Sequence, residues 1–356
     1  MTETRNALDR LRDTELGPSR RSVIKAIGGV GLGIPLAQLG LLACSSSSGG
    51  GNSISAVLSF QPDPTTLPDA GAVDTMLDKY KTKVKQRTLT GANTSIDALI
   101  AGQVDVVAAN ITAGLAAVAK GQKIVAAFPA ELTLGHMYVT NDKIQDWSDL
   151  PGKTFGITSK TDSSYVELAL LCNLHGVDVD KIKFISVPGT SGRAGALAAG
   201  KIDGGSLLIG TAVQLLAKQN NLHNFAITGK EAPDVLANAY WVRTSSLKGK
   251  QTQIQNYANS MLTQYRVLQD QSTYLSEAKK SLKGDYTDAQ LLQIYDICKQ
   301  IKIWDPAGTH WSESVGDQTA QALAKVGLVD RDLPFSQWGT TQFTAQALKT
   351  LGPYNQ

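Results

Sequence analysis

Apolar runs of strand length alternate with stretches of helical periodicity between residues 53 and 228. The apolar runs predict strands at 53–60, 103–110, 123–128, 134–142, 153–159, 181–187, 202–209 and 224–228. The stretches between them predict helices at 73–83, 94–102, 112–121, 163–176, 191–200 and 211–219. Strands that alternate with helices in this way are typical of an α/β fold with a mainly parallel sheet.

The pattern changes at about residue 245, beyond which apolar positions keep helical spacing and no further strand is predicted. The predicted helices cover 248–282, 287–301, 314–327 and 340–352. The chain is long enough for two α/β lobes. We therefore expect hinged lobes, with the helical C-terminal part packed back on the first of them.

The net charge and the few histidines and cysteines exclude several classes of function. The 356 residues carry a formal net charge of +3, and no basic patch of the kind that binds nucleic acid is visible. The histidines lack metal-ligand spacing, so we expect neither a metal nor a cofactor. They are His136, His175, His223 and His310. Cys172 and Cys298 lie in separate helical patterns, which favours two buried thiols, although an exported protein could pair them.

The first 43 residues have the charged start, apolar middle and small-residue end of a secretory signal. Arg20 and Arg21 form a pair that is typical of the twin-arginine (Tat) export route. Residues 26–43 carry no charge, but glycines and Pro35 make the stretch a weak permanent span. A signal that is cleaved is therefore favoured over the alternative, an anchor that stays in the membrane.

The end of this signal resembles the lipid-attachment box of bacterial lipoproteins. The sequence Leu-Leu-Ala-Cys places Cys44 at the position that would be lipidated. A thiol suits this task because its thiolate is a good nucleophile. Residues 44–53 are rich in Ser and Gly and predict a flexible tether at the start of the mature chain.

The segment 147–207 resembles the solute-binding proteins of ABC importers, in the branch for sulfonates, taurine, nitrate and thiamine-type pyrimidines. The residues that carry this resemblance are Trp147, Asp149, Leu150, Gly152, Lys153, Ser159, Ser163, Gly176, Asp178, Arg193, Ala196, Leu197, Gly200, Ile202 and Asp203. Residues 54–245 follow the sequence pattern of the family well, whereas the C-terminal part resembles the family only in being a series of helices.

The resemblance implies a two-lobed periplasmic-binding-protein-like fold of type II, with lobe 1 at 54–135 plus 240–356 and lobe 2 at 136–239. It also implies a monomer that is not an enzyme. Such a protein captures a small-molecule ligand and passes it to an ABC permease with its ATPase subunits. With the lipid anchor, we expect it on the outer face of the cytoplasmic membrane.

Candidate ligand-binding residues follow the predicted strands, because open α/β sheets bind ligands beyond the carboxyl ends of their strands. They are Phe60, Gln61, Asn110, Thr112, Ser159, Asp162, Ser163, Ser164, Ser191, Arg193 and Thr211. The helix start at Ser163 favours an anionic group, and Arg193 could hold a sulfonate or carboxylate through two hydrogen bonds.

Each of these residues also has a structural interpretation. Asn110, Asp162 and Ser163 could simply cap helices, and Phe60 could close the core of its lobe. Arg193 could be a surface charge. His136 is interpreted as a hydrogen-bonded structural group rather than a ligand contact.

The sequence offers little support for catalysis. The stretch 151–154, Pro-Gly-Lys-Thr, lacks the first glycine of a phosphate-binding loop, because Trp147 occupies its position. The Gly-x-Ser-x-Gly pattern of hydrolases is absent from the sequence. An exported hydrolase or metalloenzyme that uses the Tat route remains the alternative hypothesis.

Overall fold

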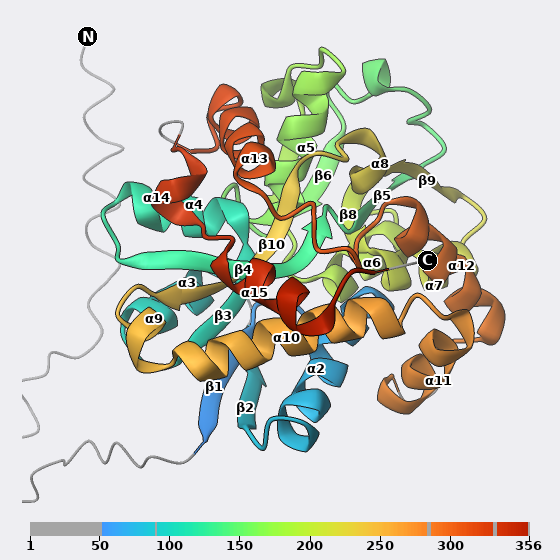
Figure 1. Ribbon diagram of the computed structural model, residues 1–356. Coiled ribbons are helices and arrows are strands. Elements are labelled where there is room, and N and C mark those ends of the chain that lie inside the picture. Colours follow the sequence, from blue (N-terminus) through green and yellow to red (C-terminus); the bar gives the residue numbers. More distant parts are fainter. Residues whose placement is uncertain (1–51, 90, 283–285, 330–332, 355–356) are drawn as a thin grey trace, which may run out of the picture. The chain divides into compact units, whose positions relative to one another are not determined.

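The computed structural model describes residues 52–89, 91–282, 286–329 and 333–354 (Figure 1). The twin-arginine pair, Cys44 and the predicted tether up to residue 51 lie outside the described residues. The described residues form two five-stranded mixed sheets with helices around them. The predicted α/β fold with two lobes and a helical C-terminal part is confirmed.

Both sheets have the same internal order. The first sheet runs β2 (Lys83–Thr88), β1 (Ser53–Leu58), β3 (Val106–Asn110), β10 (Leu236–Arg243) and β4 (Ile124–Thr133). The second runs β7 (Lys183–Ser186), β6 (Thr154–Ile157), β8 (Gly204–Leu208), β5 (His136–Asn141) and β9 (Leu222–Ile227). In each sheet the first three strands are parallel, and the fourth strand is antiparallel to both of its neighbours.

The fourth strand of each sheet follows a crossover from the other sheet. The chain passes from β4 into β5 of the second sheet, and returns from that sheet into β10. Two chain segments therefore connect the lobes, as in hinged two-lobed proteins. The predicted lobe boundaries at 135/136 and 239/240 stay a prediction, and the structure begins β5 at His136 and β10 at Leu236.

Strands β2 and β10 were not predicted from the sequence, which placed no strand between residues 228 and 248. The sequence of β2, Lys-Val-Lys-Gln-Arg-Thr, contains three charged residues and is mostly exposed. It lies at the edge of the first sheet, where charged side chains discourage pairing with another chain. By contrast, Val106, Val107, Ala108 and Ala109 of the central strand β3 are fully buried, and their apolar run was recognised.

Helices cover both sheets. Those between the strands are η1 (Pro64–Thr66), α2 (Leu67–Asp78), α3 (Ala92–Ile100), α4 (Ile111–Ala119), η2 (Trp147–Asp149), α5 (Ser163–Leu174), η3 (Val179–Lys181), α6 (Thr190–Ala198), α7 (Ile209–Leu216) and α8 (Thr228–Glu231). The C-terminal helices are α9 (Ser246–Gly249), α10 (Gln251–Val267), α11 (Gln271–Ser281), α12 (Asp288–Gln300), α13 (Glu313–Lys325), α14 (Phe335–Trp338) and α15 (Gln342–Leu351).

The C-terminal helices contact both lobes, whereas the sequence predicted that they pack on the first lobe. Helix α10 lies beside α2 and α15 along the first sheet, and α14 lies beside α4 (Figure 1). Helix α12, however, contacts η1 of the first lobe and α7 of the second. The main apolar core accordingly includes residues of both sheets, such as Tyr240 and Leu207.

The remaining sequence expectations concern cysteines, membrane spans and metal sites. Cys172 and Cys298 are both buried and unpaired, as favoured above. Among the residues that the structure describes, no helix has the length and apolar character needed to cross a membrane. The same residues contain no group of three His, Cys, Asp or Glu placed to hold a metal ion.

Candidate functional site

The carboxyl ends of the parallel strands of both sheets meet where the two lobes touch. In the first lobe these ends lead into η1 and α4, and in the second they lead into α5 and α7. Gly210 at the start of α7 lies so close to the first lobe that a Cβ there would be 2.6 Å from Asp63 Oδ2. On another side, Asn93 Nδ2 donates to Thr161 Oγ1 at 3.0 Å. We call this contact zone the inter-lobe seam.

Small cavities lie along the seam. One of about 20 Å³ is lined by residues that include Asn110 and Thr112 of the first lobe and Ser163 and Glu167 of the second. A more open one of about 360 Å³ is lined by α3, α4 and Thr161. The lobes are therefore close together in this structure, with little free volume between α4 and α5.

A row of buried and half-buried polar side chains follows the seam, and we call it the seam cluster. It comprises Asp63 after β1, Glu131 on β4, His136 on β5, Glu167 on α5 and Asn238 on β10. Glu167 Oε1 lies 2.9 Å from His136 Nδ1. Asn238 Nδ2 donates to Glu131 Oε2 at 2.6 Å. Asp63, Glu131 and Glu167 are each exposed by 5% or less.

Burial and neighbouring charges shift the proton affinities of this cluster. Burial raises the pKa of Glu131 to about 7, although the charge of His136 and the Asn238 amide oppose the shift. Burial also raises the pKa of Asp63, against hydrogen bonds from the backbone of Thr65 and Gly210. Burial lowers the pKa of His136, but the adjacent Glu167 outweighs it and leaves that pKa raised.

Several buried polar atoms of the seam lack a hydrogen-bond partner within the described residues. They include Glu131 Oε1, Glu167 Oε2, Thr65 Oγ1 and Ser206 Oγ. Thr65 lies close enough to Glu131 to lower its pKa, yet neither oxygen completes a hydrogen bond. Buried polar atoms without partners are costly and are rarely retained without a reason. These atoms mark the seam cluster as the candidate functional site.

Helix capping occupies some of the predicted ligand residues. Asn110 Oδ1 accepts from the Ala113 amide at 2.8 Å, and Asp162 Oδ1 accepts from the Ser164 amide at 3.1 Å. Both therefore cap helices, the structural interpretation that the sequence left open. The buried Ser164 hydroxyl accepts from the Thr158 amide at 2.9 Å.

The other predicted positions are spread along the seam and beyond it. Thr112 and Ser163 line the small cavity at the seam. Phe60 is half-buried and packs against the main core. Of the remaining positions, Gln61, Ser159 and Ser191 are exposed, and Thr211 is half-buried on α7.

Arg193 is neither a surface charge nor free to hold a ligand with its whole guanidinium. It is 4% exposed, and its Nε donates to the Ser206 carbonyl oxygen at 2.7 Å. Its Nη1 donates to Thr158 Oγ1 at 3.0 Å and to the Val187 carbonyl oxygen at 3.3 Å. The side chain thus ties together the ends of β6, β7 and β8. The interpretation of Arg193 as a surface charge is wrong, because the guanidinium is buried by these contacts.

The acidic members of the seam cluster were missed from the sequence. Glu131 lies in the strand sequence Ile-Val-Ala-Ala-Phe-Pro-Ala-Glu-Leu-Thr, and Glu167 lies in a helix otherwise dominated by buried apolar residues. A single carboxylate inside an apolar stretch was the available signal, because a buried acid needs a partner.

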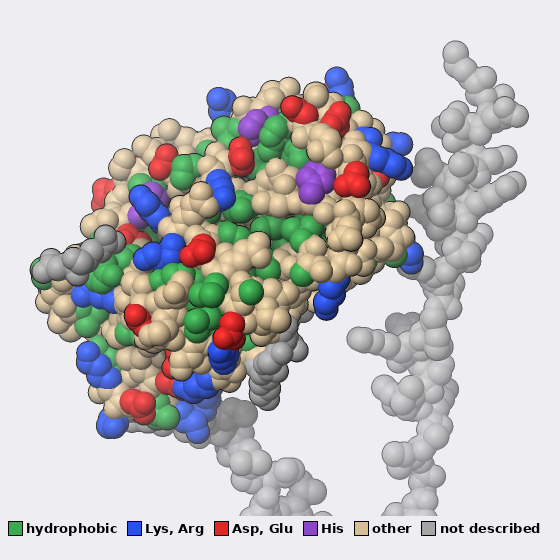
Figure 2. Space-filling view, turned by 90° about the vertical axis from the view of Figure 1, so that its right-hand side faces the viewer, with side chains coloured by type: hydrophobic (Ala, Val, Ile, Leu, Met, Phe, Trp, Pro, Cys, Tyr) green, Lys and Arg blue, Asp and Glu red, His purple; other side chains and the backbone are tan. Residues whose placement is uncertain are grey.

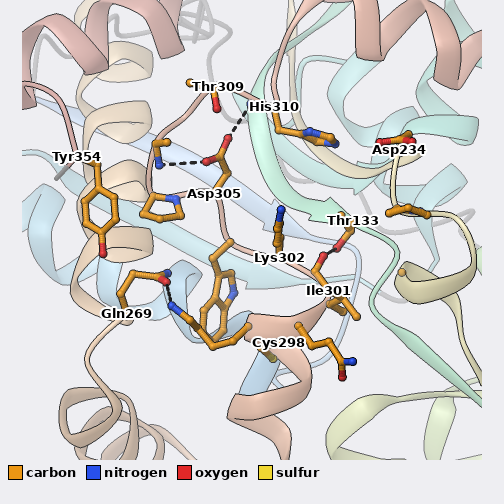
Figure 3. Close-up of a pocket in the computed structure, with 17 residues that line it drawn as sticks. Thr133, Asp234, Gln269, Cys298, Ile301, Lys302, Asp305, Thr309, His310 and Tyr354 are labelled. Atoms are coloured by element: carbon orange, nitrogen blue, oxygen red, sulfur yellow. Dashed lines mark hydrogen bonds between the residues drawn. The ribbon is translucent and has the colours of Figure 1, made fainter. Parts of the chain in front are cut away.

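A larger cavity of about 780 Å³ lies beside the crossover segments and is shown in Figure 3. The residues that line it include Thr133, Gly229, Pro233, Asp234, Gln269, the end of α12, most of the loop 301–310 and Tyr354. The exposed Lys302 points into it, whereas Asp305 turns to its own loop and accepts from the amides of Ala307 and His310 at 3.0 and 2.7 Å.

This cavity is a weaker candidate than the seam. Its acid Asp305 is already satisfied by backbone amides, and the Thr133 hydroxyl is used on the Ile301 carbonyl oxygen at 2.8 Å. His310 Nε2 alone among the side chains named here is buried without a partner. The seam, in contrast, gathers unpartnered atoms from both sheets at the carboxyl ends of the strands, where open sheets bind ligands.

Two α/β lobes joined by two crossovers define the fold class of periplasmic binding proteins. The structure matches the ligand-binding component of an ABC-type import system from Staphylococcus aureus with zinc bound (TM-score 0.69, 13% identity, 83% of this chain and 99% of that chain covered). It also matches a putative periplasmic sulfonate-binding protein SsuA from Methylobacillus flagellatus KT (TM-score 0.64, 18% identity, 85% and 98% covered). The periplasmic nitrate-binding protein NrtA from Synechocystis PCC 6803 is a third match (TM-score 0.64, 10% identity, 84% and 89% covered).

Comparison of the sequence with family models identifies the family. Residues 90–267, half of the chain, match the sequence model of the family described as NMT1/THI5 like. The chain therefore belongs to the NMT1/THI5-like family. No curated protein matches it.

Proposed function

We propose that this protein is the substrate-binding component of an ABC importer. The observation that carries the proposal is the seam cluster, in which unpartnered buried polar atoms from two hinged lobes face the same contact zone. Membership of the NMT1/THI5-like family and the similarity to import proteins support it. The protein itself performs no chemistry and hands its solute to a permease with ATPase subunits.

The solute is a small organic compound or oxyanion. The similar structures are described as binding sulfonate and nitrate, and the sequence resemblance adds taurine and pyrimidines. The ligand enters when the lobes separate and is enclosed when they meet again. The contacts of Gly210 with Asp63 and of Asn93 with Thr161 then belong to the closed form.

The test is to identify what the protein carries and whether that compound closes it. Native mass spectrometry of untagged protein, followed by release and identification of bound small molecules, should recover a compound in unchanged form. Re-adding it should raise the melting temperature by the one-site relation RT ln(1 + [L]/Kd) and reduce the radius of gyration in X-ray scattering. A protein that carries nothing and responds to no metabolite contradicts the proposal, and so does turnover of the bound compound.

The proposal includes export by the Tat route and a lipid anchor at Cys44, with a monomer tethered outside the cytoplasmic membrane. A tethered receptor stays near its permease, which raises the effective concentration of the loaded form. A stable anchor needs two acyl chains, since one alone binds only weakly.

Replacement of the thiol tests the anchor. Cys44→Ser should move the protein from the membrane fraction to the medium or periplasmic fraction, because the serine hydroxyl is not lipidated. Ser46→Ala, two residues further along the predicted tether, serves as the control and should stay with the membrane. Equal membrane association of the two variants would refute the lipid anchor and leave the binding function open.

A further inference from the structure

We propose that the seam cluster binds a positively charged nitrogen group of the solute, such as a protonated amine or amidinium, in preference to an oxyanion. This inference rests on the proposed function and names the ligand chemistry of the same site. It is specific to the side chains of this chain.

The first argument is geometric. Glu131 comes from the first sheet and Glu167 from the second lobe, and His136 interacts with both. Each carboxylate uses one oxygen within the protein, since Oε2 of Glu131 accepts from Asn238 and Oε1 of Glu167 faces His136. The second oxygen of each is buried without a partner. Unpartnered carboxylate oxygens accept hydrogen bonds, so the missing partners are N–H or O–H donors.

The second argument is the balance of charge. The seam cluster contains three carboxylates and one histidine. Arg193 lies near Glu167, but its Nε and Nη1 are held by groups of the second lobe. An oxyanion in the seam would meet three carboxyl groups, and each one that is ionised repels it, because like charges at short range in a buried site are unfavourable. A cation would meet complementary charge.

The third argument concerns the starts of α5 and α4, of which the start of α5 was the expected anion site. The start of α5 is capped by the carboxylate of Asp162, and the start of α4 by the amide oxygen of Asn110. Asp162 already places a negative charge at the positive end of the α5 dipole. These caps leave the helix starts unsuited to an anionic ligand.

Proton linkage follows from the same groups. Glu131 faces Asp63, Asp69, His136, Asn238, Thr65, Tyr265 and Cys298. With a pKa of about 7, the Glu131 carboxyl of the empty protein loses its proton as the pH rises from 6 to 8. His136, whose pKa is also raised, loses its positive charge as the pH rises through that pKa. Both changes make the site more negative, so affinity for a cation should rise with pH.

The test compares compounds matched in size and different in charge. Thermal shifts of the full-length protein are measured with ethanolamine, putrescine and agmatine as cations, taurine as a zwitterion, and isethionate, methanesulfonate and nitrate as anions. At least one cation should stabilise the protein more than any of the anions. Stabilisation by an anion and by no cation overturns the inference and leaves the proposed function in place. A protein that responds to none of these and releases no small molecule in native mass spectrometry counts against both.

Isosteric variants give the second readout. Glu131→Gln and Glu167→Gln keep the side-chain size and remove one charge each, and each should weaken cation binding by about tenfold to a hundredfold. Glu231→Gln is the matched control, because Glu231 Oε2 also lies 2.9 Å from a histidine, His175, but on the partly exposed surface of the second lobe. The decisive quantity is the ratio of affinities for the best cation and isethionate. A purely structural role would change stability and leave this ratio unaltered, which would overturn the inference.

Discussion

At the scale of single residues, side-chain burial decides which role a charged group takes. Arg193 was expected at a ligand because an arginine near a helix start suits an oxyanion. The structure gives it three hydrogen bonds to the ends of β6, β7 and β8 instead. These bonds hold the second lobe together, and direct contact of Arg193 with a ligand stays a prediction.

Truncation of Arg193 should consequently destabilise the empty protein. Arg193→Ala leaves the Thr158 hydroxyl and the Val187 and Ser206 carbonyl oxygens without this donor, which should cost about 3 kcal/mol or more. Chemical denaturation without ligand measures the loss. Arg87→Ala, on the exposed edge strand β2, should stay within about 0.5 kcal/mol of the parent. Parental stability with lost ligand binding would instead support the direct role.

Local chemistry could be predicted for single residues, and distant pairing could not. Asn110 and Asp162 were recognised as candidate caps because a cap depends only on residues within one helical turn. The partners of the seam cluster are far apart in sequence, since Glu131 pairs with Asn238 and His136 with Glu167. No local pattern shows which buried acid will meet which donor.

At the scale of elements, most apolar strands and helices were predictable, whereas the charged edge strand β2 and the buried strand β10 were missed. Strand β3 was recognised because both of its faces are buried, whereas β2 owes its structure to pairing with β1. The contact of α12 with α7 also escaped prediction, because helical periodicity shows that a face is apolar but not what covers it.

The start of α7 is the element that limits how closely the lobes approach. A methyl group at Gly210 would fall 2.6 Å from Asp63 Oδ2 and 2.7 Å from Pro64 Cδ. Gly210→Ala should therefore favour the open form and weaken ligand binding by about tenfold or more, while the side chains of Glu131 and Glu167 stay unchanged.

X-ray scattering and calorimetry check this expectation, through a larger radius of gyration and a weaker affinity. Gly195→Ala on α6 is the control, because nothing lies within 4 Å of a Cβ at that position. Equal behaviour of the two variants would show that the contact between Gly210 and Asp63 does not control closure.

At the scale of the whole molecule, buried acids make stability depend on pH. Tyr240 donates to Asp69 beneath α2, and burial raises the pKa of Asp69 from 3.8 to about 8 despite that hydrogen bond. Tyr257, Tyr265 and Glu131 also face Asp69. Folded protein therefore keeps the Asp69 proton over a pH range in which the unfolded chain has lost it.

The sign of the effect follows from proton binding. The stabilisation from protonated Asp69 is complete below about pH 4 and is lost as the pH rises towards 8, and Glu131 acts in the same direction up to about 7. Carboxyls with lowered pKa, such as Asp105 and Asp203, act only at the acidic end. The denaturation midpoint of the empty protein should decrease as the pH is raised from 5 to 8, and Asp69→Asn should make this decrease smaller. A midpoint that rises over this range would contradict the assignment.

The surface charges give no comparable bias on the face seen in Figure 2, where Lys and Arg side chains are interspersed with Asp and Glu. Charges that alternate over a surface largely cancel beyond a Debye length of about 10 Å. On this face, the surface charges therefore produce no strong net field.

The exchange of strands between the sheets has a consequence for how the chain is made. Strands β5–β9 of the second sheet are consecutive in the sequence. The second lobe can therefore assemble as soon as this segment leaves the ribosome. The N-terminal sheet must wait, because its β10 is synthesised only after that lobe. The half of the nascent chain that is translated first is thus the half that is finished last.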